Sequence, residues 1–247
     1  MEQQLSLTIL PQPDDTTCGP TCLHSIYEYY HDPLPLSQII AEVPTLAEGG
    51  TLTSLLGAHA LGRGYSAQMY SYDLNMFDPT WYGLSSAQLQ QKLQARMEFK
   101  ADSKFTVATR ANMDFLDLGG KFIFEDLTPE LIRRFLSRNI PIITELSATY
   151  LYRSAREFGY DMVFDDVRGE PSGHFVVMSG YSRPGKTVHI SDPLIPNFYA
   201  PSTPYAVPIS RLICAILLGV QTYGGTLLII QPKPEQGKTH ARTHRSE

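Results

Sequence analysis

Residues 173–193, GHFVVMSGYSRPGKTVHISDP, decide the fold that we predict for this chain. Two apolar runs flank Arg183-Pro184-Gly185, a pattern typical of a β-hairpin. His174 opens the first strand and Asp192 closes the second, and the ends of adjacent antiparallel strands lie side by side. We therefore expect Asp192 to accept the Nδ1–H of His174 and to orient the ring. Two alternatives stay open: His174 as a core histidine, and Asp192 as the initiator of an Asp-Pro turn.

Residues 12–20, QPDDTTCGP, precede the first expected helix, which begins near Gly19 with Pro20 in its first turn. A thiol here feels unpaired N–H groups and the positive end of the helix dipole, which favour the thiolate form of Cys18. Gln12 lies six residues upstream and is a candidate donor to the carbonyl oxygen that the Cys18 backbone N–H also reaches. Taken singly, Cys18 is better explained as a buried structural cysteine and Gln12 as a solvated loop residue.

Other polar residues surround these four or compete with them. Asp14 and Asp15 would oppose a thiolate if they pointed inward, so we expect them to face solvent. His189 lies on the second strand and is the rival base. Glu145 and Glu170 either shape substrate binding or are solvated strand-end carboxylates. We assign no chemistry to the remaining cysteines and histidines: Cys22, Cys214, His24, His31, His59, His240 and His244.

Together, Cys18, His174, Asp192 and Gln12 supply a nucleophile, a base, a residue that orients the base and an oxyanion donor. These are the parts needed for acyl transfer at a carbonyl. Such a mechanism requires neither a metal nor a cofactor. The histidines and cysteines of the chain also lack the spacing of a zinc site.

The order of expected elements indicates an α+β domain, with helices first and an antiparallel sheet later. Helices are expected over residues 19–30, 37–42, 51–61, 86–99, 106–116, 129–137 and 209–218. Extended segments are expected over residues 65–70, 121–125, 141–146, 175–181, 187–191 and 226–230. We predict one domain over residues 1–232 and a disordered tail over 233–247. The loop containing Trp81 and the proline-rich loop 193–208 are candidate walls of the cleft.

The composition excludes several classes of protein. The 247 residues are 43% hydrophobic and 18% charged, as in an ordinary globular protein. A net charge of −5 provides no basic surface for a nucleic acid. The longest apolar run, residues 212–220, is shorter than the roughly 20 residues that span a bilayer. With three cysteines and no secretory signal, we expect a cytoplasmic protein with no membrane or nucleic-acid partner.

These motifs resemble the peptidase C39-like family of papain-like cysteine peptidases. The likeness rests on Gln-x5-Cys-Gly-Pro opening a helix, followed by Gly-His-Phe-Val-Val and Asp-Pro on paired strands. It implies a papain-like fold in which the N-terminal helical part carries the nucleophile and packs on an antiparallel sheet carrying the histidine and aspartate. It also implies that Gln12, Cys18, His174 and Asp192 are the oxyanion donor, nucleophile, base and orienting residue. Residues 72–126 do not align with that pattern.

The resemblance leaves the substrate open. Many C39 domains precede a membrane exporter and cut double-glycine leaders, but this chain has neither a transmembrane segment nor a GxxxxGK[ST] loop. The same motif order also resembles phytochelatin synthase, a papain-like transpeptidase. We therefore expect hydrolysis of a peptide or related small amide through a thioester. The alternatives are γ-glutamyl-type transfer to an amine, a non-catalytic binding module that keeps the cleft, and a structural domain. The oligomeric state is not predicted.

Overall fold

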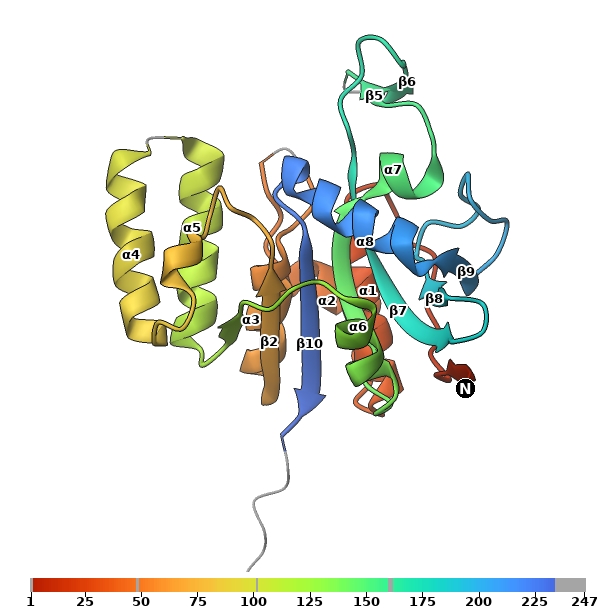
Figure 1. Ribbon diagram of the computed structural model, residues 1–247, viewed down its shortest axis with the longest axis horizontal. Coiled ribbons are helices and arrows are strands. Elements are labelled where there is room, and N and C mark those ends of the chain that lie inside the picture. Colours follow the sequence, from red (N-terminus) through yellow and green to blue (C-terminus); the bar gives the residue numbers. More distant parts are fainter. Residues whose placement is uncertain (1, 48, 101, 160–161, 234–247) are drawn as a thin grey trace, which may run out of the picture.

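A single large β-sheet forms the centre of the computed structural model, which describes residues 2–47, 49–100, 102–159 and 162–233 (Figure 1). Its strands are β1 Glu2–Gln4, β2 Tyr65–Ser71, β3 Lys121–Ile123, β4 Ile142–Ser147, β7 Gly173–Ser182, β8 Thr187–Ser191, β9 Tyr205–Pro208 and β10 Thr226–Pro232. Their order is β3-β2-β10-β4-β7-β8-β9, with β1 added to β7. Neighbouring strands are antiparallel except the pair β2 and β3.

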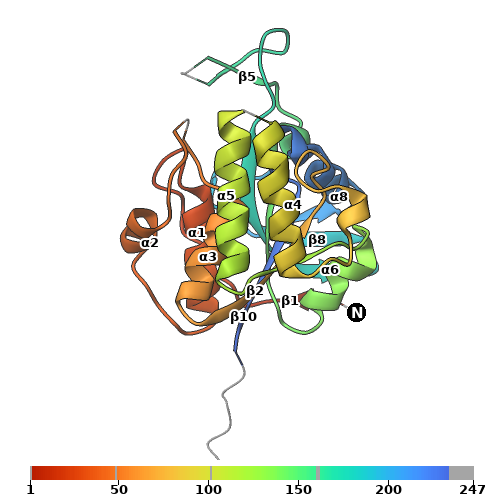
Figure 2. The ribbon, with the colours of Figure 1, turned by 90° about the vertical axis from the view of Figure 1, so that its left-hand side faces the viewer.

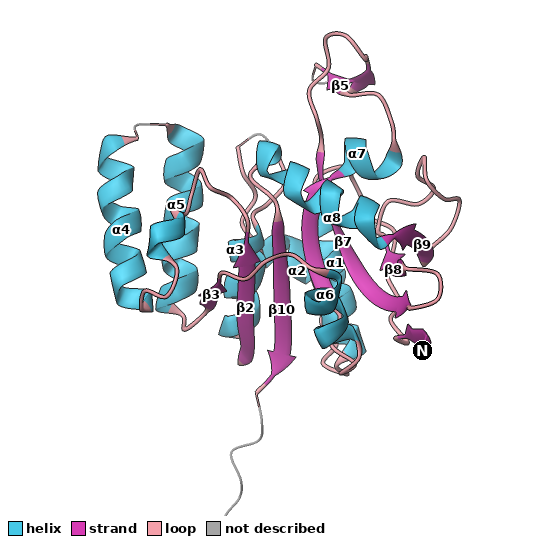
Figure 3. Cartoon of the chain, in the orientation of Figure 1, coloured by secondary structure: helices cyan, strands magenta, loops and turns pink. Residues whose placement is uncertain are grey.

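Helices cover both faces of this sheet (Figure 1, Figure 2). They are α1 Cys18–Tyr29, α2 Leu36–Glu42, α3 Thr53–Gly62, α4 Ser86–Phe99, α5 Ser103–Asp117, α6 Pro129–Leu136, α7 Ala148–Tyr152 and α8 Ile209–Leu218, with short 3₁₀ turns η1 Pro79–Trp81 and η2 Gly219–Thr222. The first three helices lie behind the sheet in Figure 1, and α6 and α8 lie in front of it. Figure 3 shows the strands between these two layers. The expected fold class, a helix with the cysteine packed on a sheet with the histidine and aspartate, is confirmed.

The main core lies between α1 and the central strands. Leu23 and Ile26 of α1 are buried, as are Val176 and Val177 of β7. Burying one such side chain contributes about 1.5–3 kcal/mol. The start of α1 comes close to the sheet because Gly19 has no side chain: a Cβ there would lie 2.7 Å from Thr51 Cγ2 and 3.3 Å from Phe175 Cδ2. This close approach sets the position of Cys18, the residue just before Gly19.

Residues 72–126, which match no expected pattern, are organised by α4 and α5. The two helices pack against each other at one edge of the sheet, beside β3 (Figure 2). They build a second core cluster that includes Leu93 and Phe105. The expected helix 106–116 begins earlier, at Ser103, because Asp102 Oδ1 accepts from the backbone N–H of Phe105 at 2.7 Å and caps it. Trp81 packs against this second cluster.

The structure corrects the expectation for residues 193–208, which are not loop throughout. Tyr205–Pro208 form the edge strand β9, with Tyr205 opposite Ile190 of β8. The prolines that suggested a loop are compatible with an edge strand, because an outward-facing N–H is not needed there. Helix α7 and the small hairpin of β5 (Glu157–Phe158) and β6 (Val163–Phe164) were also not expected, since elements this short show no periodicity. The predicted tail beyond Lys233 lies outside the described residues.

Candidate active site

Cys18, His174 and Asp192 come from three elements that meet at one end of the sheet. Cys18 is the first residue of α1, His174 is the second residue of β7, and Asp192 directly follows β8. His174 Nε2 donates to Asp192 Oδ1 at 2.9 Å, and both side chains are buried. The expected hydrogen bond between His174 and Asp192 is therefore present, but it is made by Nε2 instead of Nδ1. Strand spacing determines which residues meet, whereas the ring rotamer is set by tertiary packing. Nδ1 is left as the ring nitrogen available to Cys18.

The electrostatics of the pair favour a protonated imidazole beside an ionised carboxylate. Burial alone would lower the pKa of His174, but the charge and hydrogen bond of Asp192, followed by the Cys18 thiol, raise it to about 10. Burial would raise the pKa of Asp192, but the charge and hydrogen bond of His174 and two tyrosine hydroxyls hold it below its usual value. A protonated histidine next to a cysteine is the arrangement that stabilises a thiolate.

The Asp192 carboxylate also accepts four bonds that the sequence did not predict. Tyr152 Oη donates to Oδ2 at 2.7 Å and Tyr205 Oη at 2.5 Å. Asn197 Nδ2 donates to Oδ2 at 3.2 Å, and the backbone N–H of Leu194 donates to Oδ1 at 2.9 Å. These donors fix the orientation of the carboxylate. Burial, and then the charge of Asp192, raises the pKa of both tyrosines, so they remain donors throughout the physiological range.

The sequence carries little signal for these partners. Tyr205 lies on the four-residue strand β9, whose alternation of buried and exposed side chains is apparent only in the structure. Asn197 lies in the proline-rich loop that follows Asp192, and this loop supplies hydrogen bonds to the aspartate. Tyr152 comes from the five-residue helix α7, which carries no sequence signal.

Gln12 lies at the same end of the sheet, because its backbone N–H donates to the carbonyl of Pro193 at 2.9 Å. Its side-chain Nε2 donates to the carbonyl of Asp14 at 2.8 Å, while its Oε1 is buried without a hydrogen-bond partner. Asp14 and Asp15 face solvent as expected. The residue expected to stabilise an oxyanion is thus close to Asp192 in the fold, with one amide hydrogen engaged within its own loop.

The rival candidates lie elsewhere or are inert. His189 pairs with the side chain of Gln4. His59 lies between Tyr27 and Glu42, with Nδ1 2.8 Å from the tyrosine hydroxyl. Cys22 is fully buried one turn after Cys18, and burial raises the pKa of its thiol well above the usual value.

The two glutamates left open make their contacts outside the triad. Glu145 Oε2 accepts from Thr53 Oγ1 at 2.8 Å, inside a buried polar cluster that includes Thr226. Burial is the main reason that the pKa of Glu145 rises to about 8. Glu170 pairs through its backbone with Glu157, at the base of the β5–β6 hairpin. Among the described ranges, no group of His, Cys, Asp and Glu side chains could hold a metal ion.

The fold and these residues agree with a match to known proteins. Residues 3–201 match the model of the Peptidase_C39 like family, and the chain belongs to this family. Its cysteine helix packed on a sheet with the histidine and aspartate is the arrangement that the resemblance implied. No curated protein sequence matches the chain. Over the parts of the chain that the structure describes, no helix is long and apolar enough to cross a bilayer.

Three solved structures resemble the chain at low identity. A C39-like peptidase from Bacillus anthracis is 14% identical, with a TM-score of 0.47, over 95% of this chain and 100% of that one. A double glycine motif protease from an AMS/PCAT transporter, in complex with its leader peptide, is 14% identical, with a TM-score of 0.44, over 94% and 99%. The peptidase domain of Streptococcus ComA, a bifunctional ABC transporter of a quorum-sensing pathway, is 15% identical, with a TM-score of 0.42, over 92% and 99%.

Proposed function

We propose that this protein is a cysteine peptidase that cleaves a peptide or related amide through a thioester on Cys18. The observation that carries the proposal is the buried 2.9 Å bond between His174 and Asp192, beside a cysteine at the start of a twelve-residue helix. Family membership supports the same class of reaction. The expected roles of Cys18, His174, Asp192 and Gln12 are part of this proposal.

The first half of the reaction forms the acyl-enzyme. The Cys18 thiolate attacks the carbonyl carbon, and the electron pair of the C=O bond moves to oxygen. The Cys18 backbone N–H and the Gln12 amide stabilise this oxyanion; the amide carries two hydrogens, so its bond to Asp14 leaves one free. The C–N bond then breaks, and the amine leaves with the proton of the His174 imidazolium.

The second half restores the enzyme. Neutral His174 takes a proton from water, whose oxygen attacks the thioester carbon. The C–S bond breaks and releases a carboxylic acid, leaving thiolate and imidazolium again. Asp192 stays ionised in both halves because its donors hold its pKa low, and it stabilises each imidazolium that forms.

The test begins with alkylation by iodoacetamide. Cys214 is exposed and would also react, so the parent protein is Cys214→Ser; Cys22 has no exposed surface, whereas Cys18 is 8% exposed. In this background we expect rapid alkylation of Cys18 near neutral pH, strong slowing in His174→Ala, and no labelling in Cys18→Ala. Mass spectrometry identifies the modified residue. A Cys18 that reacts no faster than an ordinary thiol, or labelling that persists in Cys18→Ala, contradicts the proposal.

Substrate turnover is then assayed with a mixed peptide-amide library, with water or added amines as acceptors. Hydrolysis products that disappear in Cys18→Ala support a peptidase. Amine adducts in place of acids would instead indicate a transpeptidase. We also propose that the enzyme works in the reducing cytoplasm, which is supported by its three free cysteines.

A further inference from the structure

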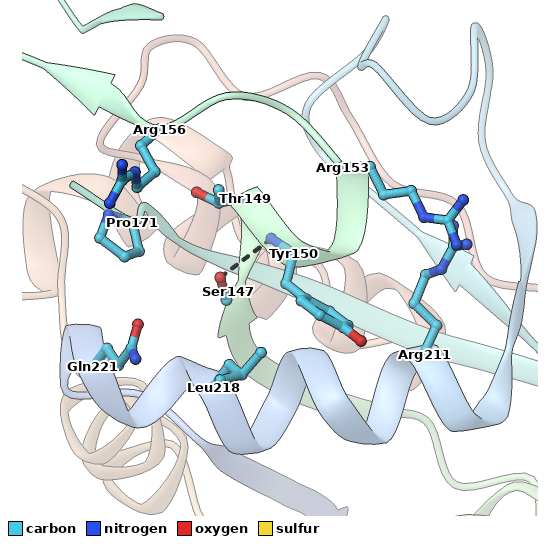
Figure 4. A pocket seen from close by; sticks show the side chains of 9 residues that line it. All are labelled: Ser147, Thr149, Tyr150, Arg153, Arg156, Pro171, Arg211, Leu218 and Gln221. Atoms are coloured by element: carbon cyan, nitrogen blue, oxygen red, sulfur yellow. Dashed lines mark hydrogen bonds between the residues drawn. The ribbon is translucent and has the colours of Figure 1, made fainter. Parts of the chain in front are cut away.

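A cavity of about 320 Å³ opens between α7 and α8 (Figure 4). This volume is within the roughly 300–1,000 Å³ typical of ligand pockets. Its lining residues are Ser147, Thr149, Tyr150, Arg153, Arg156, Pro171, Arg211, Leu218 and Gln221. They come from the end of β4, from α7 and the segment after it, from the approach to β7, and from α8 with η2. No reaction step described above uses this cavity.

One wall of the cavity adjoins the start of β7, the strand that carries His174. Ser147 pairs with Gly173, the residue before His174. Ser172 is held by α7, because its backbone N–H donates to Thr149 Oγ1 at 3.0 Å. Pro171 lies three residues before His174, and an extended chain advances about 3.3 Å per residue. A peptide residue a few positions from the scissile bond can therefore reach the cavity.

The cavity is cationic although the protein is acidic. Three arginines line it and no aspartate or glutamate does, against a net charge of −5 for the chain. The guanidinium groups of Arg153 and Arg211 point toward each other (Figure 4). Within the described residues, neither has a carboxylate partner; Arg211 lies over the Tyr199 ring, 5.5 Å from its centroid. Arg156 instead donates to the backbone carbonyl of Asp166.

The position of Arg153 adds to this picture. It ends α7 in the left-handed region, with φ of 56°, where glycine is the usual residue. The chain thus places a long cation at the rim of the cavity at a position that favours a residue with no side chain. Two unpaired guanidiniums that converge make a site for a planar anion, which each can bind by a pair of parallel hydrogen bonds.

Apolar surface in the same cavity favours a ligand whose anionic group is attached to a hydrocarbon chain. Tyr150 and Leu218 lie in the lining and are 44% and 36% exposed. In Figure 4 the Tyr150 ring lies between Ser147 and the two facing arginines. A glutamate side chain has methylene groups to contact such a surface and a carboxylate to reach Arg153 and Arg211.

We propose that this cavity is a substrate subsite for an acidic residue, with its carboxylate held between Arg153 and Arg211; the proposal rests on the peptidase function proposed above. The cavity is also tied to the triad. Arg211 stacks over Tyr199, whose ring centroid lies 5.2 Å from that of Tyr205, and Tyr205 donates to Asp192. An acidic residue bound to Arg211 is thus connected to Asp192 through the rings of Tyr199 and Tyr205.

Binding is tested first, with a Cys18→Ala protein that cannot turn over substrate. The probes are N-acetyl tetra-alanine amides in which one alanine is replaced by Glu or by Gln, in each position in turn. We expect at least one Glu peptide to bind about tenfold or more tightly than its Gln partner, and Arg153→Gln/Arg211→Gln to abolish the difference. The control Arg110→Gln/Arg138→Gln, which removes two exposed cations outside the cavity, keeps it. Equal binding of Glu and Gln in all positions, no binding of any peptide, or inorganic phosphate binding as tightly as the best Glu peptide overturns the proposal.

A charge swap guards against a variant that loses binding by misfolding. Arg153→Glu/Arg211→Glu is expected to melt as a folded protein and to prefer a further probe, the same peptide with Lys in place of Glu. A folded swap variant that still prefers Glu overturns the subsite.

A second measurement separates this inference from the catalytic one. Peptidyl chloromethyl ketones carrying Glu or Gln in the preferred position are offered to the Cys214→Ser protein, and alkylation of Cys18 is timed. We expect the Glu reagent to react about tenfold faster, with equal rates in Arg153→Gln/Arg211→Gln. Labelling of Cys18 without preference contradicts the subsite alone. Absence of Cys18 labelling, with Glu-selective binding intact, contradicts the peptidase proposal alone.

Discussion

Tyr205 Oη donates to Asp192 Oδ2 at 2.5 Å, from an edge strand that pairs with the strand ending at the aspartate. The bond couples the outermost strand of the sheet to the residue that orients the candidate base. Tyr152, from α7, donates to the same oxygen at 2.7 Å. Asp192 is thereby held by groups that arrive from separate elements, and its ionised form is stabilised without contact with water.

Replacing Tyr205 by Phe tests this relationship. The hydroxyl lowers the pKa of Asp192, so its loss raises that pKa, and the acidic limb of the pH–rate profile for Cys18 alkylation moves to higher pH. We also expect a loss of about 1.5–3 kcal/mol in stability, as for a bond to a charged group. The profile is measured with iodoacetamide in the Cys214→Ser background.

Tyr199→Phe is the matched control for this experiment. Tyr199 packs on Tyr205, but its own hydroxyl donates to the backbone carbonyl of Ala206 at 3.3 Å on the surface. We expect its profile to follow that of the parent. An acidic limb that stays in place in Tyr205→Phe, or moves equally in both variants, shows that the tyrosine hydroxyl does not act through Asp192.

The pairing of His174 with Asp192 could be predicted because both residues lie on one hairpin, where register follows from local spacing. The place of Cys18 was predictable for a similar reason, since Gly19 and Pro20 indicate the start of a helix. The partners of Asp192 were not, because Tyr152 comes from a helix of five residues and Tyr205 from a strand of four. Elements this short contain too few residues to show a period, and only tertiary packing forms them.

The buried carboxyl of Glu145 predicts a stability that depends on pH. Burial is the main cause that raises its pKa from 4.5 to about 8, so folding favours the protonated form. Its contribution to stability is fully present below the unfolded pKa and is lost as pH rises through about 8. In Glu145→Gln we expect a smaller decline in the free energy of unfolding between pH 5 and 8.5. At pH 8.5 the variant should have a larger free energy of unfolding than the parent.

Urea unfolding at several pH values measures this effect, and Glu98→Gln is its control because Glu98 is exposed on α4. The control should follow the parent at every pH. Alkylation of Cys18 should be unchanged in Glu145→Gln, since Glu145 lies in the cluster with Thr53 and Thr226. A Glu145→Gln protein that declines with pH as steeply as the parent shows that the carboxyl is not buried as a neutral acid.

Two glycine substitutions should have opposite effects on stability. In Gly19→Ala the new Cβ would lie 2.7 Å from Thr51 Cγ2, and we expect a loss of about 1–3 kcal/mol from overpacking. In Gly62→Ala, at the end of α3, the Cβ meets nothing within 4 Å, and a helical alanine should add about 0.5–1 kcal/mol. Chemical denaturation measures both. Equal stability of Gly19→Ala and the parent means that α1 does not approach the sheet as closely as described.

Gln12→Ala separates an oxyanion donor from a structural residue. Peptide cleavage passes through a tetrahedral oxyanion, and losing one donor to it costs about 10²–10³ in kcat. Alkylation by iodoacetamide forms no oxyanion, so its rate at Cys18 should be unchanged. Both rates are measured on the same preparation, with Asp15→Ala, an exposed neighbour, as control. If Gln12→Ala slows both reactions together, the glutamine acts by holding the loop through Asp14 and Pro193. If it slows neither, the oxyanion is stabilised by backbone groups alone.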